Sequence, residues 1–262
     1  MPRACQVSLS WSDQATTVCG GLCYLVPRQM TFPKRLLQKL SLSLLLGLTA
    51  AISVLVFLAW LADEVLEGGT RAFDEAIREA VHQIASPTLT TLMRGISFLG
   101  STQFLFAATT VMVIWFVFRR WKREAILLAV TMIGASLLNI TLKLAFKRVR
   151  PEPFFNLATP RSFSFPSGHS LASFCFFGAL AAILNARVQN RKFRLVIVAS
   201  AGMMVLLIGL SRIYLGVHYP TDVIAGYCAA LIWIGAVKFV EETLVRRKRR
   251  KADPPISTDY AD

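Results

Sequence analysis

Long apolar runs are the feature that most limits what this chain can fold into. A helix needs about 20 mostly apolar residues to cross the hydrocarbon core of a bilayer. The chain has 262 residues, of which 55% are hydrophobic and only 17% are charged, a combination that is rare in soluble domains. We therefore predict an all-α fold, a bundle of six transmembrane helices. The predicted spans are residues 41–62, 97–118, 124–146, 169–186, 194–214 and 221–240.

A shorter helix is predicted between the first two spans. Apolar residues recur at helical spacing from Phe73 to Ile84, and acidic and basic residues lie among them. Gly68 and Gly69 precede this segment and allow the chain to turn away from the first span. The pattern indicates an amphipathic helix at the outer membrane surface, where a cap over the bundle is favoured over a role in guiding substrate. His82 is interpreted as a surface residue of this helix.

The distribution of Lys and Arg predicts the orientation in the membrane. Eighteen of these cations flank one set of span ends, within 28–39, 119–123, 187–194 and 246–251, whereas nine lie on the other side. The side with more cations is cytoplasmic by the positive-inside rule. Both termini are therefore predicted to be cytoplasmic. The net charge of +14 is explained by these flanks and by contact with anionic lipid headgroups, and no nucleic-acid-binding motif accompanies it.

The two ends of the chain are predicted to lie outside the bundle. Residues 1–40 are interpreted as a cytoplasmic tail that is partly disordered, residues 41–240 as the membrane domain, and residues 241–262 as a basic and then disordered tail. Met30 is an alternative start to Met1. The five cysteines form neither a metal-binding pattern nor a disulfide framework, and the sequence specifies no oligomeric state.

Three polar clusters lie at the ends of the predicted spans, all on the outer side. Charged groups are costly near lipid and are usually functional where they occur. Their residue types suit the binding of a tetrahedral oxyanion that one histidine attacks while another supplies a proton. The clusters are Lys143-x6-Arg150-Pro151, then Pro166-Ser167-Gly168-His169, then Ser211-Arg212-x5-His218-x3-Asp222.

The third cluster supplies the predicted nucleophile. His218 and Asp222 are four residues apart and share a face of a helix that can start at Pro220. A carboxylate that accepts the Nδ1 proton of His218 leaves Nε2 bare and nucleophilic. Arg212 precedes them and can reach a bound anion. The structural alternative is a helix cap formed by His218 and Asp222, with Arg212 as an interfacial anchor.

The other two clusters supply anion-binding groups and an acid. Ser167 is a natural N-cap, and the N–H groups of Gly168 and His169 at a helix N-terminus form an anion site. His169 could donate a proton to a leaving oxygen. Lys143 and Arg150 lie two helical turns apart and can bind phosphate oxygens. An ordinary cap and snorkelling side chains are the alternatives, and Lys147 and Arg148 are interpreted as interfacial cations without a catalytic role.

Together, the three clusters resemble the three-part signature of the type 2 phosphatidic acid phosphatase superfamily at every position. The signature covers residues 143–222, and the six-span layout extends the resemblance over 41–240. The resemblance implies that His218 forms a phosphohistidine, that Asp222 orients it and that His169 is the acid. It also implies that no metal is required. The implied phosphate-binding residues are Lys143, Arg150, Ser167, Gly168 and Arg212.

The expected activity is hydrolysis of a lipid phosphate or diphosphate at the outer face of a membrane, without a cofactor. The compact size and short loops resemble members from bacterial inner membranes. Undecaprenyl diphosphate, phosphatidylglycerol phosphate and phosphatidic acid are the candidate substrates, with undecaprenyl diphosphate favoured because an outward-facing site suits recycling of a lipid carrier. The alternatives are a vanadate-dependent haloperoxidase, which the six spans disfavour, and a transporter, which would place polar residues at mid-span.

Overall fold

The computed structural model describes residues 17–19, 22–24, 34–158 and 161–252. The chain divides into two units, residues 1–48 and 49–262. The first unit contains the first turns of α1 and an antiparallel hairpin of two strands, β1 (Thr17–Cys19) and β2 (Leu22–Tyr24). The disorder predicted for the two ends falls largely outside the described residues.

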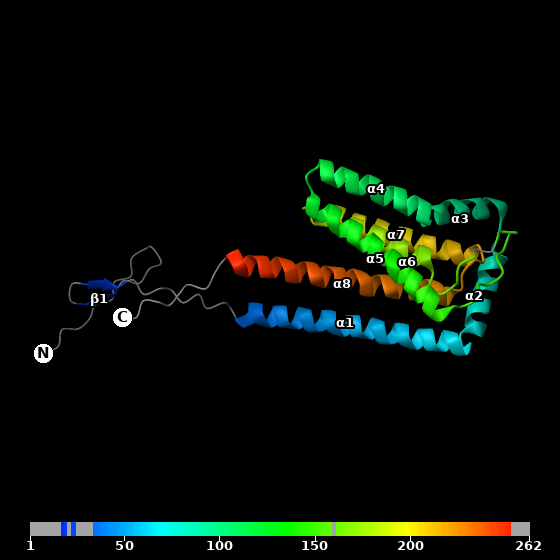
Figure 1. The fold of residues 1–262 in the computed structure, drawn as a ribbon, viewed down its shortest axis with the longest axis horizontal. Helices are drawn as coiled ribbons and strands as arrows, with labels where there is room; N and C mark the ends of the chain where they lie inside the picture. Colours follow the sequence, from blue (N-terminus) through cyan, green and yellow to red (C-terminus); the bar gives the residue numbers. More distant parts are fainter. Residues whose placement is uncertain (1–16, 20–21, 25–33, 159–160, 253–262) are drawn as a thin grey trace. The chain divides into compact units, whose positions relative to one another are not determined.

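The second unit is a bundle of helices over the residues that the structure describes. Figure 1 shows α4 to α8 running side by side, with α2 lying across one end of the bundle. The helices are α1 (Lys34–Glu67), α2 (Arg71–Gln83), α3 (Pro87–Leu99), α4 (Thr102–Phe118), α5 (Lys122–Phe146), α6 (Gly168–Asn185), α7 (Arg191–Tyr214) and α8 (Pro220–Ala252).

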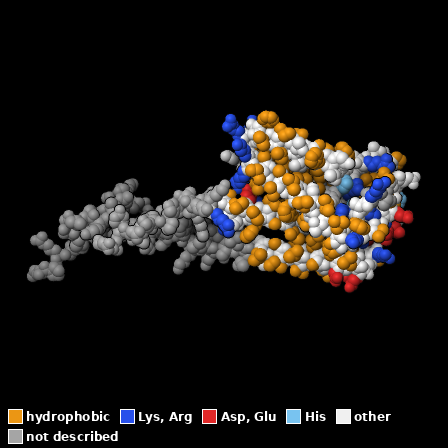
Figure 2. All heavy atoms as spheres, in the orientation of Figure 1, with side chains coloured by type: hydrophobic (Ala, Val, Ile, Leu, Met, Phe, Trp, Pro, Cys, Tyr) orange, Lys and Arg blue, Asp and Glu red, His pale blue; other side chains and the backbone are white. Residues whose placement is uncertain are grey.

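The bundle has the apolar exterior of a membrane protein. Five helices are long and apolar enough to cross a bilayer, and α3 with α4 passes the same test as a bent pair. Large hydrophobic side chains such as Phe106, Ile133 and Leu206 are exposed along them. Figure 2 shows hydrophobic side chains over the middle of the visible face and charged ones towards its ends. This arrangement places the apolar belt against lipid and confirms a helical protein with multiple spans.

The second predicted span differs from a single straight helix. Residues 97–99 belong to α3, and the run from 102 to 118 forms α4, with a bend of 48° between them. The break occurs because the Ser101 hydroxyl accepts a hydrogen bond from the Phe104 N–H at 3.2 Å and caps a new helix. Helix α3 was not predicted, since residues 87–96 lack the uniform apolarity of a span.

Helix α2 occupies the predicted amphipathic segment, and two of its charged side chains face the protein. Asp74 and Arg78, one helical turn apart, are buried, whereas Phe73 and Ile84 are exposed. The helix contacts α7 and α8. It is therefore held to the bundle by polar contacts as well as by Val81, which packs against a small apolar cluster around Tyr214.

Helix α6 forms the centre of the bundle, because it packs against α5, α7 and α8. Small residues on α8 allow its close approach to α6: Ala229 and Ala230 are buried in one cluster with Leu171 and Cys175 of α6. A Cβ atom at Gly226 would lie 2.8 Å from the Ser167 carbonyl oxygen. The close contact at Gly226 fixes the start of α8 against the start of α6.

Substitution of Gly226 tests this packing. The Gly226→Val variant must separate α6 from α8 and should lose about 1–3 kcal/mol of unfolding free energy, as overpacked cores do. The measurement is the midpoint of thermal unfolding in detergent. Gly235→Val on the same helix is the matched control, because no atom lies within 4 Å of its added Cβ. Equal midpoints for the two variants would contradict the proposed contact.

Candidate active site

The structure brings the three polar clusters to one end of the bundle. Lys143 lies in the last turn of α5, His169 in the first turn of α6, Arg212 in the last turn of α7 and Asp222 in the first turn of α8. The short segment between α7 and α8 carries His218. Helix ends from four elements therefore surround one histidine.

The turn before His218 depends on a glycine. Gly216 has a φ of +71°, and a Cβ atom there would lie 2.6 Å from the backbone nitrogen of Phe154. The Phe154 N–H donates to the Leu215 carbonyl at 3.1 Å. Glycine thus lets the segment after α5 pack tightly against the turn that carries His218.

His218 is buried and is held at both ring nitrogens. Its Nδ1 lies 3.2 Å from Asp222 Oδ2, and its Nε2 lies 3.0 Å from Arg150 Nη1. Burial lowers the pKa of the imidazole to about 3, although the Asp222 carboxylate opposes this shift. The ring is therefore neutral at pH 7, with a proton on Nδ1 for Asp222 and a lone pair on Nε2.

Asp222 accepts hydrogen bonds on both oxygens. Its Oδ2 accepts from the Tyr219 N–H at 2.9 Å and from the Ser164 hydroxyl, and its Oδ1 accepts from Arg148 Nη1 at 2.7 Å. The Ser164 hydroxyl also lies 3.4 Å from His218 Nδ1. These contacts fix the carboxylate, which in turn fixes the orientation of the imidazole.

Three cations of the clusters lie around this pair without carboxylate partners. Arg150 donates to the carbonyls of Val217 at 2.8 Å and Ser162 at 2.6 Å, and Lys143 donates to the carbonyl of Phe163. Arg212 donates to the Ser97 hydroxyl at 2.5 Å. Within residues 34–158 and 161–252, none of the three forms an ion pair. Burial also lowers the pKa of the Arg150 guanidinium, because its charge has lost contact with water. A bound anion would compensate for this loss, so the site favours an anion.

The second cluster caps α6. The Ser167 hydroxyl accepts from the Ser170 N–H at 3.4 Å, and the Ser167 N–H donates to the Asp222 carbonyl at 2.9 Å. The next N–H groups, of Gly168 and His169, belong to the first turn of α6, where no helical acceptor exists for them. The His169 ring lines a cavity of about 320 Å³ together with Arg212 and Ser97.

Arg148 is the main group that the sequence analysis misjudged. It is not an exposed interfacial cation, since its guanidinium bridges two buried carboxylates, Asp222 at 2.7 Å and Asp74 at 2.7 Å. Its Nη1 also donates to the Thr221 hydroxyl at 2.8 Å. Burial alone would lower the pKa of Arg148, but the two carboxylates outweigh this effect and raise it. Lys147 is exposed, as predicted.

Asp74 links α2 to the start of α8. Besides Arg148, it accepts from the Thr221 N–H at 3.0 Å and from the Thr221 hydroxyl at 2.8 Å. The spacing of Asp74 and Arg78 places both on one face of α2, but it does not indicate partners so far away in the chain. Ser164 carried no comparable signal, because nothing in a loop sequence separates this serine from its neighbours.

Comparison with known proteins agrees with this geometry. The PAP2 superfamily model matches residues 124–245. Phosphatidylglycerophosphatase B of Bacillus subtilis is 33% identical over 200 residues, which cover 76% of this chain and 98% of that protein. The undecaprenyl-diphosphatase of Sulfolobus acidocaldarius is 30% identical over 178 residues, covering 62% of this chain and 79% of that protein.

A solved structure extends the likeness to the fold. The crystal structure of a transmembrane PAP2-type phosphatidylglycerolphosphate phosphatase from Bacillus subtilis has a TM-score of 0.69 and 33% sequence identity. The match covers 74% of this chain and 96% of that one. The likeness to these proteins extends over the helices that carry all three polar clusters, and the chain belongs to the PAP2 superfamily.

Proposed function

We propose that this chain is a membrane lipid phosphatase that hydrolyses the terminal phosphate of a lipid phosphate or diphosphate. The observation that carries the proposal is the position of His218, which is held between Asp222 and Arg150 and surrounded by cations that have no ion-pair partner among the described residues. The helices around it are apolar enough to lie in a bilayer, which provides the lipid. The names of the relatives, phosphatases of several lipids, support the same activity.

The reaction has two steps. In the first step, Nε2 of His218 attacks phosphorus, a P–N bond forms, and the P–O bond to the lipid breaks as His169 protonates the leaving oxygen. In the second step, water attacks phosphorus and gives a proton to His169, and the P–N bond breaks to release phosphate. Throughout, Lys143, Arg150 and Arg212 stabilise the charge on the phosphoryl oxygens, together with the Ser167 cap and the N–H groups of the first turn of α6.

The orientation of the chain is part of the proposal. Six spans, with α3 and α4 forming the bent second one, place both termini on the cytoplasmic face, where most cations of the flanks lie. The catalytic cluster then lies at the outer face of a bacterial inner membrane, with α2 at the interface beside it. Phe73 of α2 and Ile84, which follows its last residue, are exposed and suited to contact lipid there.

Phosphatidylglycerol phosphate is the first candidate substrate. The Bacillus subtilis relative named for that lipid aligns over nearly its whole length, whereas the undecaprenyl-diphosphatase aligns over 79% of its length. Undecaprenyl diphosphate, which the sequence analysis favoured, is the second candidate. Both present a terminal phosphate at the membrane surface.

Phosphate release from purified protein tests the function. We expect turnover of at least one lipid from a panel of phosphatidylglycerol phosphate, undecaprenyl diphosphate and phosphatidic acid, with a chelator present. His218→Ala should reduce the rate by roughly 1,000-fold or more, because the nucleophile is lost. His82→Ala is the matched control, since His82 is exposed and its ring stacks on Phe154, which belongs to none of the three clusters. Substantial turnover by folded His218→Ala, or dependence on added Mg²⁺, would refute the mechanism.

Asp74→Asn tests the positioning role of the buried carboxylates. The amide keeps the size of Asp74 but pairs poorly with Arg148, so the Asp222 carboxylate loses its fixed position. We expect kcat to fall roughly 10- to 100-fold while KM changes little, as displacement of a reacting group does. Glu75→Gln is the control, because Glu75 is exposed and its ion pair is with Arg78 of the same helix. A parallel loss of folded protein without a change in kcat per folded molecule would indicate a purely structural role.

Cysteine labelling in intact cells tests the orientation. Val149, which is 81% exposed, lies beside the cluster, and Lys122 begins α5 at the opposite end. In a cysteine-free background, Val149→Cys should react with a membrane-impermeant maleimide from outside the cell. Lys122→Cys should react only after permeabilisation. The reverse pattern would place the active site in the cytoplasm.

A further inference from the structure

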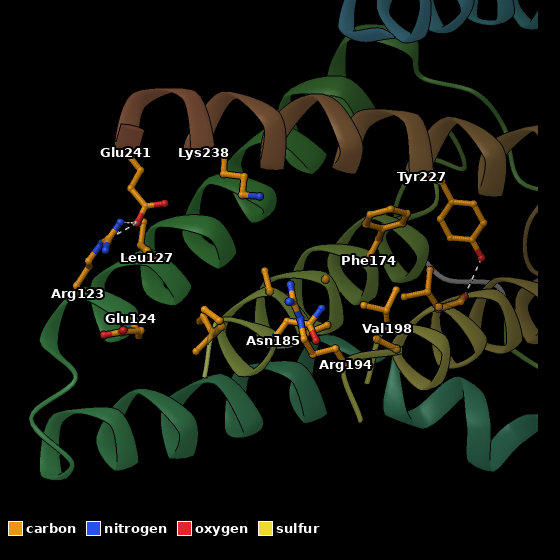
Figure 3. A pocket seen from close by; sticks show the side chains of 18 of the residues that line it. Arg123, Glu124, Leu127, Phe174, Asn185, Arg194, Val198, Tyr227, Lys238 and Glu241 are labelled. Carbon is orange, nitrogen blue, oxygen red and sulfur yellow. Dashed lines mark hydrogen bonds and ion pairs between the residues drawn. The ribbon is translucent and has the colours of Figure 1, made fainter. Parts of the chain in front are cut away.

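A large cavity lies at the end of the bundle opposite the catalytic cluster. It has a volume of about 850 Å³ and is enclosed by α5, α6, α7 and α8 (Figure 3). Its inner wall is apolar, with Phe174 from α6 and Val198 from α7 among the side chains that Figure 3 labels. The mechanism described above uses no residue of this cavity.

Tyr227 of α8 contacts α7 at the inner end of the cavity. There the Tyr227 hydroxyl donates to the Val205 carbonyl at 2.8 Å, and Tyr227 packs directly on Gly209. Further towards the start of α7, small residues such as Ala201 and Gly202 line the cavity. Tyr227 therefore closes the inner end of the cavity and separates it from the catalytic cluster.

The depth of the cavity matches one leaflet of a bilayer. Its lining on α7 includes Arg194 and Val205, which are eleven positions, or about 16 Å, apart along a helix. Half of the hydrocarbon core of a bilayer is about 15 Å thick. An acyl chain of the leaflet at that end can therefore fill the cavity from its mouth to Tyr227.

The mouth of the cavity carries an excess of positive charge. The two carboxylates there are already paired: Glu241 with Arg123 at 2.6 Å and Glu124 with Arg187 at 2.5 Å. Arg194 and Lys238 also line the mouth, and neither has an ion pair in the described part of the chain. Two unpaired cations above an apolar cavity are complementary to a lipid phosphate.

A second polar feature lies between these cations and the apolar wall. Asn185 Oδ1 is buried and has no hydrogen-bond donor among the residues that the structure describes. A buried acceptor without a donor costs about 1–3 kcal/mol. A headgroup that carries a hydroxyl can supply the missing donor, which a choline headgroup cannot do.

We propose that this cavity binds one phospholipid with an anionic, hydroxyl-bearing headgroup from the leaflet opposite the catalytic cluster. An acyl chain lies between α7 and α8 with its end at Tyr227, the phosphate lies between Arg194 and Lys238, and a headgroup hydroxyl donates to Asn185. The site is separate from the reaction centre, because Arg194 and Arg212 are eighteen residues, or about 27 Å, apart on α7.

Native mass spectrometry of the purified full chain tests occupancy. The probes are 1-palmitoyl-2-oleoyl phosphatidylglycerol and the matching phosphatidylcholine. We expect an adduct of one lipid, with phosphatidylglycerol preferred roughly fivefold or more. Gly202→Phe should remove this adduct, because a side chain at Gly202 meets no other atom within 4 Å and projects into the cavity space. Gly235→Phe is the control, since Gly235 is equally open but does not line the cavity.

A charge variant tests the headgroup contact independently. The double variant Arg194→Gln/Lys238→Gln should keep a lipid adduct but lose the preference for phosphatidylglycerol. Arg191→Gln/Lys192→Gln removes two neighbouring exposed cations that do not line the cavity, and should keep the preference. The preference should also persist in Arg212→Gln. Its loss in Arg212→Gln would instead place the lipid at the catalytic cluster, and equal adducts in Gly202→Phe and wild type would overturn the proposal.

Discussion

The fork that Arg148 makes between Asp74 and Asp222 is the interaction on which the rest of the site depends. One guanidinium joins a helix that lies across the bundle end to the first turn of α8 and thereby to the carboxylate behind His218. Removing one partner of such a buried pair typically costs 3–5 kcal/mol, since the other charge stays buried alone. Through these two ion pairs, the short helix α2, which lies outside the predicted spans, helps to fix the position of His218.

The remaining cations are held by a different device. Arg150 and Lys143 donate to carbonyl groups of the loop at 162–164 and of Val217, which satisfy their N–H groups without cancelling their charge. Carboxylates in the same positions would have stabilised the protein but neutralised the site. A carboxylate lies at Nδ1 of His218, and carbonyl groups hold the cations near Nε2. Negative charge therefore orients the imidazole, while the region at Nε2, where a phosphate would bind, remains positive.

The helical fold class could be predicted from the sequence, and so could the residues of the three clusters that lie together in the structure. Both depend on short sequence patterns. Runs of apolar residues specify spans, and four-residue spacing brings His218 to Asp222. The bend at Gly100 was missed, since a capping serine inside an apolar run gives a weak signal. Arg148, Asp74 and Ser164 were missed for another reason: Asp74 meets Arg148 across 74 residues of chain, and no local pattern reports such a contact.

Arg150 belongs to the cations that would bind the anion, and it also contacts the nucleophile. Its Nη1 donates to His218 Nε2, the atom that must attack phosphorus, as well as to the Val217 carbonyl. A hydrogen bond from guanidinium to a phosphate oxygen is stronger than one to a neutral imidazole, because both partners carry charge. An arriving phosphoryl group should therefore draw the Arg150 N–H to its own oxygen and release the Nε2 lone pair. On this argument the nucleophile becomes free at the moment when an oxyanion lies beside it, and the cation that masked it then stabilises the charge that develops in the transition state.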